Sequence, residues 1–305
     1  MTLDLQRLSF SRGDFVVKTM DKLVRTYLQR IKEIFPQEIE TFAMRGSGDD
    51  FVIIEVNQNW MFRFPRNELS QKAMGIETAF LAEFETISPL PVPARSYFGE
   101  NFVGYRKIQG EQLTSEVFVK LSKRAQKRIA QQLGQFLSSL HTFPVEKAAS
   151  IGIGDGWNGL HYQTGLYFLE HVVPMLSPTA RQKSLPLMES LLAEEFEGRV
   201  IHGDFYFPDH VFYDKSKQEL SGVIDFGDVT IYDIAHDWQC IVEIGGEAFF
   251  ETVMDHYHNH NDATLLKRSK MRLDARPLFV AGRIFLQGLE DQYADRLARI
   301  ESQFG

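Results

Sequence analysis

Two short apolar segments that each end in an aspartate constrain this chain more than any other feature. Residues 200–204 read Val-Ile-His-Gly-Asp, and residues 222–228 read Gly-Val-Ile-Asp-Phe-Gly-Asp. They predict two strands with Asp204 and Asp225, 21 residues apart, at the exposed strand ends. A carboxylate at the end of a buried strand is costly unless it binds a proton, a cation or hydrogen-bond donors. Two such carboxylates on neighbouring elements suit phosphoryl transfer, in which one orients a hydroxyl nucleophile and the other holds Mg²⁺.

The bulk composition is that of a globular enzyme. With 305 residues, 44% of them hydrophobic and 24% charged, the chain can build one large domain or two lobes. No apolar run approaches the ~20 residues of a membrane helix, and the N-terminus lacks the pattern of a secretory signal. The single cysteine, Cys240, excludes an internal disulfide and fits a reducing compartment. We therefore expect a cytoplasmic protein, with a monomer as the default.

The net charge of −8 is concentrated in one segment. Residues 201–260 hold twelve Asp and Glu residues against two lysines. An acidic surface disfavours nucleic acid, whose backbone selects for Lys and Arg. It attracts a small cationic substrate or a divalent metal, and here the acids surround the two motif aspartates. A solvated acidic face is the alternative interpretation.

The hydrophobic pattern divides the chain into two parts. Residues 18–35 predict an amphipathic helix, which is followed by five short strands and one inserted helix. Beyond residue 109 the pattern is mostly helical apart from the two motif strands. We expect an α+β protein with an N-terminal lobe at 1–104, a hinge at 105–111 and a mainly helical C-terminal lobe at 112–305. The five strands are expected at 41–45, 51–56, 60–64, 96–98 and 102–108.

The two aspartate motifs, in this order and in the C-terminal half, resemble those of the kinase-like phosphotransferases that modify small molecules. The resemblance is to the aminoglycoside phosphotransferases in particular, closest to the 2''-phosphotransferase branch, and includes residues 62–65, 90–93 and 103–111. It implies a protein-kinase-like two-lobe fold with a small antiparallel sheet in the N-terminal lobe. It also implies Mg²⁺-dependent transfer of the γ-phosphate of GTP or ATP to a hydroxyl of an aminoglycoside-type antibiotic.

The same resemblance assigns roles to the motif residues. Asp204 corresponds to the catalytic base, and His202 is expected to bond the backbone of the catalytic loop. Asp225 corresponds to a Mg²⁺ ligand. A second metal ligand is expected five residues after the base, where this chain has Asp209. A one-residue insertion in the loop would place His210 there instead, and we favour His210.

The triphosphate site is expected in the N-terminal lobe. Gly46, Ser47 and Gly48 join two expected strands, and glycine lets backbone N–H groups approach an anion closely. A plain turn is the alternative for this segment. By resemblance, Arg63 occupies the position of a triphosphate-binding lysine, and Glu77 in the following helix is its partner.

The nucleotide base is expected to bind where the two lobes join. Tyr105, Lys107 and Ile108 occupy the strand whose backbone hydrogen-bonds the base in the family that the chain resembles. Tyr105 corresponds to the residue that controls the depth of the base pocket, and its bulk favours guanine over adenine.

Carboxylates near the acceptor hydroxyl would recognise an aminoglycoside, because this rigid sugar carries several ammonium groups. We expect Asp228, Asp237, Glu243 and Glu247 to supply them. Each of these acids, taken alone, is also compatible with an ordinary surface position.

Two other functions compete with aminoglycoside phosphorylation. The acceptor could be a macrolide, choline, homoserine or a sugar, and the chain could be a nucleotide-binding pseudokinase. The arginine at position 63 and the spacing of Asp209 and His210 favour a pseudokinase, whereas the presence of both motif aspartates disfavours it. Residues 154–159 match the dinucleotide fingerprint GxGxxG, but no strand precedes them, so we interpret them as a loop.

Overall fold

The computed structural model describes residues 14–47, 50–258 and 262–305. By its internal contacts the chain forms two compact units, Met1–Gly75 with Ala94–Lys107, and Ile76–Pro93 with Ile108–Gly305. The last transition between the units, from Lys107 to Ile108, lies within the range 105–111 that we expected for the hinge. The segment Ile76–Pro93, which we expected in the N-terminal lobe, belongs instead to the second unit. The reason is its apolar content, because Phe80, Phe84 and Leu90 are buried in the core of that unit.

The first unit contains the expected five-stranded antiparallel sheet, in the order β1-β2-β3-β5-β4. The residues Val52, Ile54 and Val56 alternate along β2 and bury their side chains, as a half-buried strand requires. Strand β1 continues to Ser47, past the expected end at Arg45, with a register shift between Met44 and Gly46. The elements are α1 (Asp14–Ile34), β1 (Phe42–Ser47), β2 (Phe51–Val56), β3 (Trp60–Pro65), α2 (Glu68–Phe84), β4 (Arg95–Gly99) and β5 (Phe102–Arg106).

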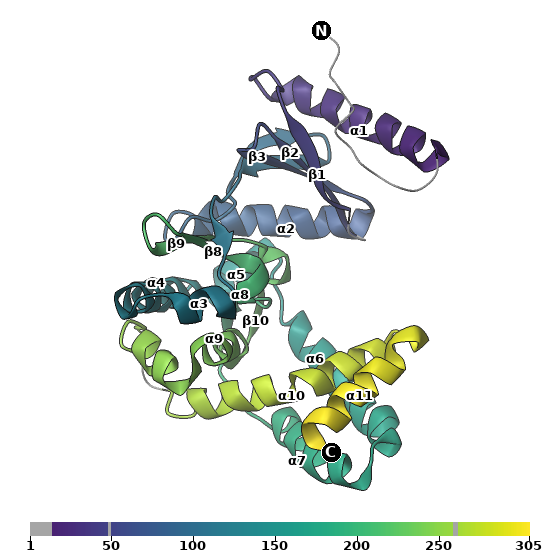
Figure 1. Cartoon of the computed structure of the whole chain (residues 1–305), viewed down its shortest axis with the longest axis vertical. Coiled ribbons are helices and arrows are strands. Elements are labelled where there is room, and N and C mark those ends of the chain that lie inside the picture. The colour runs from purple at the N-terminus through teal and green to yellow at the C-terminus, as the bar shows by residue number, and fades with distance from the viewer. Residues whose placement is uncertain (1–13, 48–49, 259–261) are drawn as a thin grey trace. The chain divides into compact units, whose positions relative to one another are not determined.

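The second unit is mainly helical, as expected (Figure 1). Serine and threonine side chains cap several of its helices; Ser122, for example, accepts the backbone N–H of Ala125 at the start of α4. The helices are α3 (Ser115–Lys120), α4 (Lys123–His141), α5 (Val145–Ile151), α6 (Gly156–Tyr167), η1 (Phe168–Val172), η2 (Val173–Met175), α7 (Pro178–Leu192), α8 (Phe207–His210), η3 (Phe226–Asp228), α9 (Ala235–Met254), α10 (Leu265–Leu286), η4 (Glu290–Gln292) and α11 (Tyr293–Phe304).

The two motif strands lie in different small sheets of the second unit. Strand β7 (Arg199–Ile201) precedes Asp204 and pairs with β10 (Thr230–Tyr232). Strand β9 (Glu219–Val223) precedes Asp225 and pairs with β8 (Val211–Asp214), which also pairs with β6 (Glu111–Gln112). The aspartates are therefore brought together by the loops that follow the strands, and the two strands do not pair with each other.

The GxGxxG pattern is a loop only in part, which corrects our expectation for residues 154–159. Gly154 and Asp155 lie in the connection after α5, whereas Gly156 begins α6 and the rest of the pattern is helical. The carbonyl oxygen of Gly154 accepts hydrogen bonds from the backbone N–H of Ile231, at 3.0 Å, and from the hydroxyl of Thr230, at 2.8 Å. These contacts fasten the loop to β10 and give it a structural role.

Two apolar cores stabilise the second unit. One surrounds Phe136, Phe226 and Trp238 and lies beneath the loops that carry the motif aspartates. The other lies between α7, α10 and α11. Helix α10 also packs against α9 and α6 (Figure 1), so its side chains reach the space between these helices.

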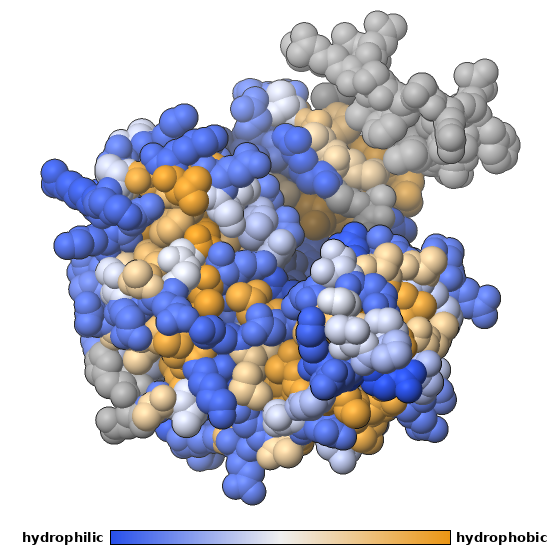
Figure 2. Space-filling view, turned by 60° about the horizontal axis from the view of Figure 1, so that its bottom comes forward, coloured by the Kyte–Doolittle hydropathy of each residue, from blue (hydrophilic) through white to orange (hydrophobic). Residues whose placement is uncertain are grey.

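The surface carries no extended apolar face in the view of Figure 2, where apolar groups are interspersed with hydrophilic ones. Within the described ranges, no helix is both long enough and apolar enough to cross a lipid bilayer.

Candidate active site

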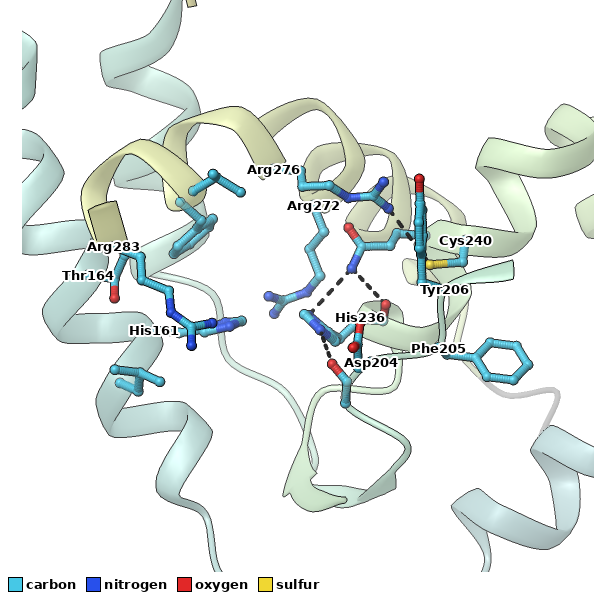
Figure 3. Close-up of a pocket in the computed structure, with 15 residues that line it drawn as sticks. His161, Thr164, Asp204, Phe205, Tyr206, His236, Cys240, Arg272, Arg276 and Arg283 are labelled. Carbon is cyan, nitrogen blue, oxygen red and sulfur yellow. Dashed lines mark hydrogen bonds between the residues drawn. The ribbon is translucent and has the colours of Figure 1, made fainter. Parts of the chain in front are cut away.

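Asp204 stands in a tight loop directly after β7. Its side chain is 49% exposed and lines a pocket of about 370 Å³ in the second unit (Figure 3). Gly203 is required at this turn because its φ is +83° and a Cβ atom there would lie 2.1 Å from the carbonyl oxygen of Asp228. The sequence His-Gly-Asp thus places a carboxylate at the pocket wall in a conformation that only glycine permits.

His202 holds the loop in place, as its position in the motif predicted. The ring is fully buried; its Nδ1 accepts the backbone N–H of Asp204 at 3.3 Å, and its Nε2 donates to the carbonyl oxygen of Ile224 at 3.1 Å. These two bonds require a neutral ring protonated on Nε2. Burial lowers the pKa of His202, which favours the neutral form. One side chain therefore ties the loop of Asp204 to the residue that precedes Asp225.

Asp237 is the second support of this loop, and our expectation that it binds the acceptor is wrong. Its carboxylate is fully buried and accepts the backbone N–H groups of His202, at 2.8 Å, and of Gly203, at 3.2 Å. The same carboxylate lies 3.2 Å from Nε2 of His141. Burial opposes its ionisation, but the hydrogen bonds from His141 and from the backbone of His202 outweigh burial and lower the pKa of Asp237. A substrate cannot reach a side chain that is enclosed in this way.

Asp225 lies next to His210 on the other side of the loop. Its backbone is left-handed, with φ +67°, which is an uncommon and strained conformation for a residue other than glycine. Its Oδ2 is 3.5 Å from Nε2 of His210, and Nδ1 of His210 is 2.7 Å from the carbonyl oxygen of Asp204. The ring of His210 therefore bridges the two motif aspartates.

The structure separates the two candidates for a second metal ligand. His210 is largely buried and faces both motif aspartates, whereas Asp209 is exposed, one residue earlier in α8. Helix α8 ends at His210 and presents its ring to Asp225.

The charges around Asp225 fit a divalent cation. Asp228 is an exposed residue, but protein atoms surround its carboxyl group. This desolvation, together with the negative charges of Asp204 and Asp225, raises the pKa of Asp228. A cation would relieve the repulsion among these carboxylates. In the described part of the chain, no three metal-binding side chains are close enough to hold an ion alone. Mg²⁺ does not need such a set, because it retains waters and uses one or two protein ligands together with substrate phosphates.

The pocket beside Asp204 is rich in arginine. Arg272, Arg276 and Arg283 reach it from α10, and His161 reaches it from α6 (Figure 3). His236 completes this polar wall, and its Nε2 donates to the carbonyl oxygen of Gly203 at 2.9 Å. Burial lowers the pKa of His161 to about 2 and that of His236 to about 4, so both rings are neutral at pH 7.

The two glutamates that we expected to bind the acceptor are paired with cations instead. Glu243 accepts two hydrogen bonds of 2.8 Å from Arg276, and Glu247 forms an ion pair with Lys270. Neither glutamate lines the pocket next to Asp204. The fourth predicted substrate carboxylate, Asp228, lies close enough to the motif aspartates for their charges to raise its pKa.

The expected triphosphate residues are distributed over both units. Gly46 and Ser47 lie at the end of β1, paired with Ile53 and Val52, so they extend the strand and are not part of a free loop. Gly48 lies outside the described residues. Arg63 lies on β3, with its guanidinium 3.7 Å from the ring centroid of Phe51.

Glu77, the expected partner of Arg63, is a buried residue of α2.

The segment expected to bind the nucleotide base is partly occupied by contacts within the first unit. The backbone N–H of Lys107 donates to the carbonyl oxygen of Asn59 at 2.8 Å, and its ammonium group lies 2.7 Å from Glu55. Both donors of Lys107 are thus engaged. The ring of Tyr105 lies under the guanidinium of Arg95, at 4.5 Å, while Ile108 is the first residue of the second unit along this segment.

Sequence reasoning did not identify the basic side of the pocket. Arg272, Arg276 and Arg283 are separated by four and seven residues, a spacing that places them on one face of a helix. This pattern was readable, but nothing in the sequence indicated that the face would point towards Asp204.

Comparisons with known proteins identify the family of this chain. Residues 38–271 match the model of the phosphotransferase enzyme family (APH), and the chain belongs to that family. The chain is therefore a kinase-like O-phosphotransferase.

Among solved structures, the GDP and kanamycin complex of APH(2'')-IIIa is 27% identical, with a TM-score of 0.79, and the match covers 91% of this chain and 98% of that one. Two further structures share the fold at lower identity. The streptomycin and ATP complex of APH(2'')-IIa is 17% identical, with a TM-score of 0.68 and 97% of each chain covered. Macrolide 2'-phosphotransferase MphH from Brachybacterium faecium is 20% identical, with a TM-score of 0.68, and covers 93% of this chain and 98% of that one.

Proposed function

We propose that this protein transfers the γ-phosphoryl group of a nucleoside triphosphate to a hydroxyl group of a small organic molecule. The observation that carries the proposal is the half-exposed carboxylate of Asp204, which stands in the pocket wall with the pair of His210 and Asp225 beside it. Phosphoryl transfer requires an oriented hydroxyl and a bound polyphosphate close together, and this arrangement can serve both.

Asp204 acts as the base of the reaction. Its carboxylate accepts a hydrogen bond from the acceptor hydroxyl and takes the proton as the new O–P bond forms and the bond to the nucleoside diphosphate breaks. Because the transition state of phosphoryl transfer is loose, placement of the carboxylate matters more than a raised pKa. The supports from His202 and Asp237 provide this placement.

Asp225 and His210 hold Mg²⁺ in this proposal. When bound, the ion neutralises charge on the phosphates. The strained backbone of Asp225 and the repulsion around Asp228 support a cation at this place. Asp209, which is exposed, takes no part.

The donor is GTP or ATP. The GDP bound in the structure of the relative at 27% identity supports GTP, and the bulk of Tyr105 agrees with that choice. Arg63 provides positive charge for the phosphates in place of a lysine, and Glu77 orients it. The end of β1, at Gly46 and Ser47, is the phosphate-binding segment in this proposal.

Kanamycin in the 27% identical relative makes aminoglycosides the first acceptors to test, and macrolides are the second class. The proposal includes a monomer that acts in the cytoplasm on a soluble acceptor. A binding-only pseudokinase is disfavoured, because Asp204 and Asp225 are both present and lie beside the same histidine.

A coupled assay of nucleoside diphosphate release tests the proposal. Wild-type protein with Mg²⁺ and either GTP or ATP is compared with the variant Asp204→Asn. The acceptors tested are kanamycin, a macrolide, choline, glucosamine, glucose, glucuronate and glucose 6-phosphate. Acceptor-dependent release that is lost in the variant supports the proposal. Release that is independent of every acceptor and equal in both proteins contradicts it.

A further inference from the structure

Arginine is the most frequent charged residue in the lining of the pocket beside Asp204, which we call the acceptor pocket. Three guanidinium groups line it, at Arg272, Arg276 and Arg283, and Asp204 is the only carboxylate among the described lining residues. The two lining histidines are neutral, since burial lowers the pKa of both. A polycation placed here would meet guanidinium groups at short range.

Two of the three arginines are neutralised from behind. Arg272 donates to Asp233 at 2.8 Å, and Asp233 also accepts from Arg268. Arg268 pairs in turn with Asp262 at 2.7 Å, so two carboxylates balance two guanidinium groups. Arg276 is matched one to one by Glu243. Among these arginines, the unbalanced charge is therefore that of Arg283.

Arg283 is the arginine available to a ligand. It is exposed, and no hydrogen bond or ion pair engages its side chain within the part of the chain that the structure describes. Its charge acts at longer range on His161 and on Asp228, whose pKa it lowers in each case. Figure 3 shows its guanidinium beside His161, across the pocket from Tyr206.

The remaining wall is apolar. Leu160 on α6 and Phe279 and Val280 on α10 line the pocket between the basic groups. Such a wall accommodates the carbon skeleton of a ligand, while a few polar groups set its orientation.

We infer that the natural acceptor is a hydroxylated organic anion whose carboxylate or phosphate group binds at Arg283 and whose hydroxyl faces Asp204. This inference rests on the proposed phosphotransfer and narrows its acceptor away from polycationic drugs. A guanidinium is suited to both oxyanions, because it offers parallel N–H donors to two oxygens. Asp204 is the carboxylate among the described lining residues, so it is the group that can accept the proton of the acceptor hydroxyl.

Binding of four matched hexoses tests the inference without requiring turnover. Glucosamine, glucose, glucuronate and glucose 6-phosphate differ in charge on a similar ring. Their dissociation constants are measured by ligand-observed NMR with the full chain, Mg²⁺ and a non-hydrolysable GTP analogue, which occupies the phosphate-binding region. We expect glucuronate or glucose 6-phosphate to bind at least about tenfold more tightly than glucose, and glucosamine most weakly.

The variant Arg283→Gln should reduce this preference about tenfold and leave the affinity for glucose unchanged. Arg299→Gln is the matched control, because Arg299 is an exposed arginine of α11 paired with Asp295 and does not line the pocket. Tighter binding of glucosamine, equal binding of all four sugars, or an Arg283→Gln protein that keeps the preference overturns the inference.

The two proposals fail separately in this design. An Arg283-dependent preference for anions in a protein that phosphorylates nothing would uphold the pocket assignment and overturn the proposed function. Efficient phosphoryl transfer to kanamycin, without any preference for anions, would uphold the proposed function and overturn the pocket assignment.

Discussion

The carboxylate of Asp237, in α9, accepts a 2.8 Å hydrogen bond from the backbone N–H of His202, in the loop that carries the candidate base. This bond joins residues 35 positions apart in the chain. Both residues are fully buried, and His141 holds the same carboxylate from the other side at 3.2 Å. The position of Asp204 therefore depends on a buried acid that never meets the substrate.

Replacing this acid should cost stability as well as activity. In Asp237→Asn, the amide can accept through only one oxygen, and its NH₂ group faces donors that the carboxylate satisfied. We expect the free energy of unfolding to fall by about 3 kcal/mol, the range for breaking a buried charged network. Urea unfolding measures the change. Glu247→Gln, which removes an exposed ion pair, is the control and should have little effect; equal losses in both variants would contradict the assignment.

Replacing the candidate base should separate transfer from nucleotide binding. Asp204→Asn keeps the size of the side chain but cannot accept the proton of the hydroxyl, so kcat should fall by about 10²–10⁴. The affinity for Mg²⁺–GTP, measured by calorimetry, should stay within a few-fold of the wild type. Normal turnover by this variant would show that another group is the base.

Asp225 and His210, the proposed Mg²⁺ ligands, should affect both nucleotide binding and phosphoryl transfer. We expect Asp225→Asn to raise the Mg²⁺ concentration required for half-maximal nucleotide binding by at least about tenfold, because one charge-assisted contact is lost. His210→Ala should act in the same direction, whereas Asp209→Asn, next to it but exposed, should not. A larger effect at position 209 than at position 210 would reverse the choice of ligand. Removal of Mg²⁺ with EDTA should abolish transfer in every variant.

Mild acid should destabilise the second unit through its neutral histidines. Burial lowers the folded-state pKa of His202, of His161 to about 2 and of His236 to about 4, while an unfolded histidine titrates near 6.5. Below about pH 6.5 the unfolded chain therefore binds more protons than the folded one. Stability is fully present above that pH and is lost as the pH falls towards 4, by about 1.4 kcal/mol per pH unit for each ring.

Urea unfolding between pH 7.5 and 5 measures this slope. His236→Gln should reduce the slope by about one proton, since glutamine can still donate to the carbonyl oxygen of Gly203 and does not titrate. His171→Gln, which changes an exposed histidine, should leave the slope as in the wild type. The pKa values of Asp233 and Asp237 are lowered, so titration of these carboxyls changes the stability only at pH values below the range of this experiment.

Local patterns in the chain were sufficient to predict both motif loops. The motif residues are adjacent in the chain and could be recognised there, but their loop is held by contacts with Asp228 and Asp237 that the sequence did not reveal. The five strands of the first unit were also predictable, because alternating side chains such as Val52 and Ile54 report a half-buried surface. The glycine-rich turn was misjudged, since β1 extends through Ser47 and Gly46 pairs with Ile53.

The same kind of pattern misled the assignment of substrate acids. Asp237, Glu243 and Glu247 lie on one helix after the metal motif, and an acidic segment suggested a cationic ligand. In the structure, Asp237 is enclosed by the catalytic loop, and the two glutamates meet arginine and lysine from α10. Net charge along a segment does not reveal which opposite charges another helix brings to it.

The sequence by itself indicated the kind of chemistry, because an aspartate after a strand, a glycine and a histidine are adjacent residues that form a readable motif. Only the tertiary structure decided which contacts hold this loop and which charges line the pocket. Helix α10 lies more than sixty residues beyond Asp204 in the chain, and its packing against α9 and α6 turns Arg272 and Arg283 towards that carboxylate. Charges from distant segments acquire a common function only when packing places them around one cavity, where water no longer screens them fully.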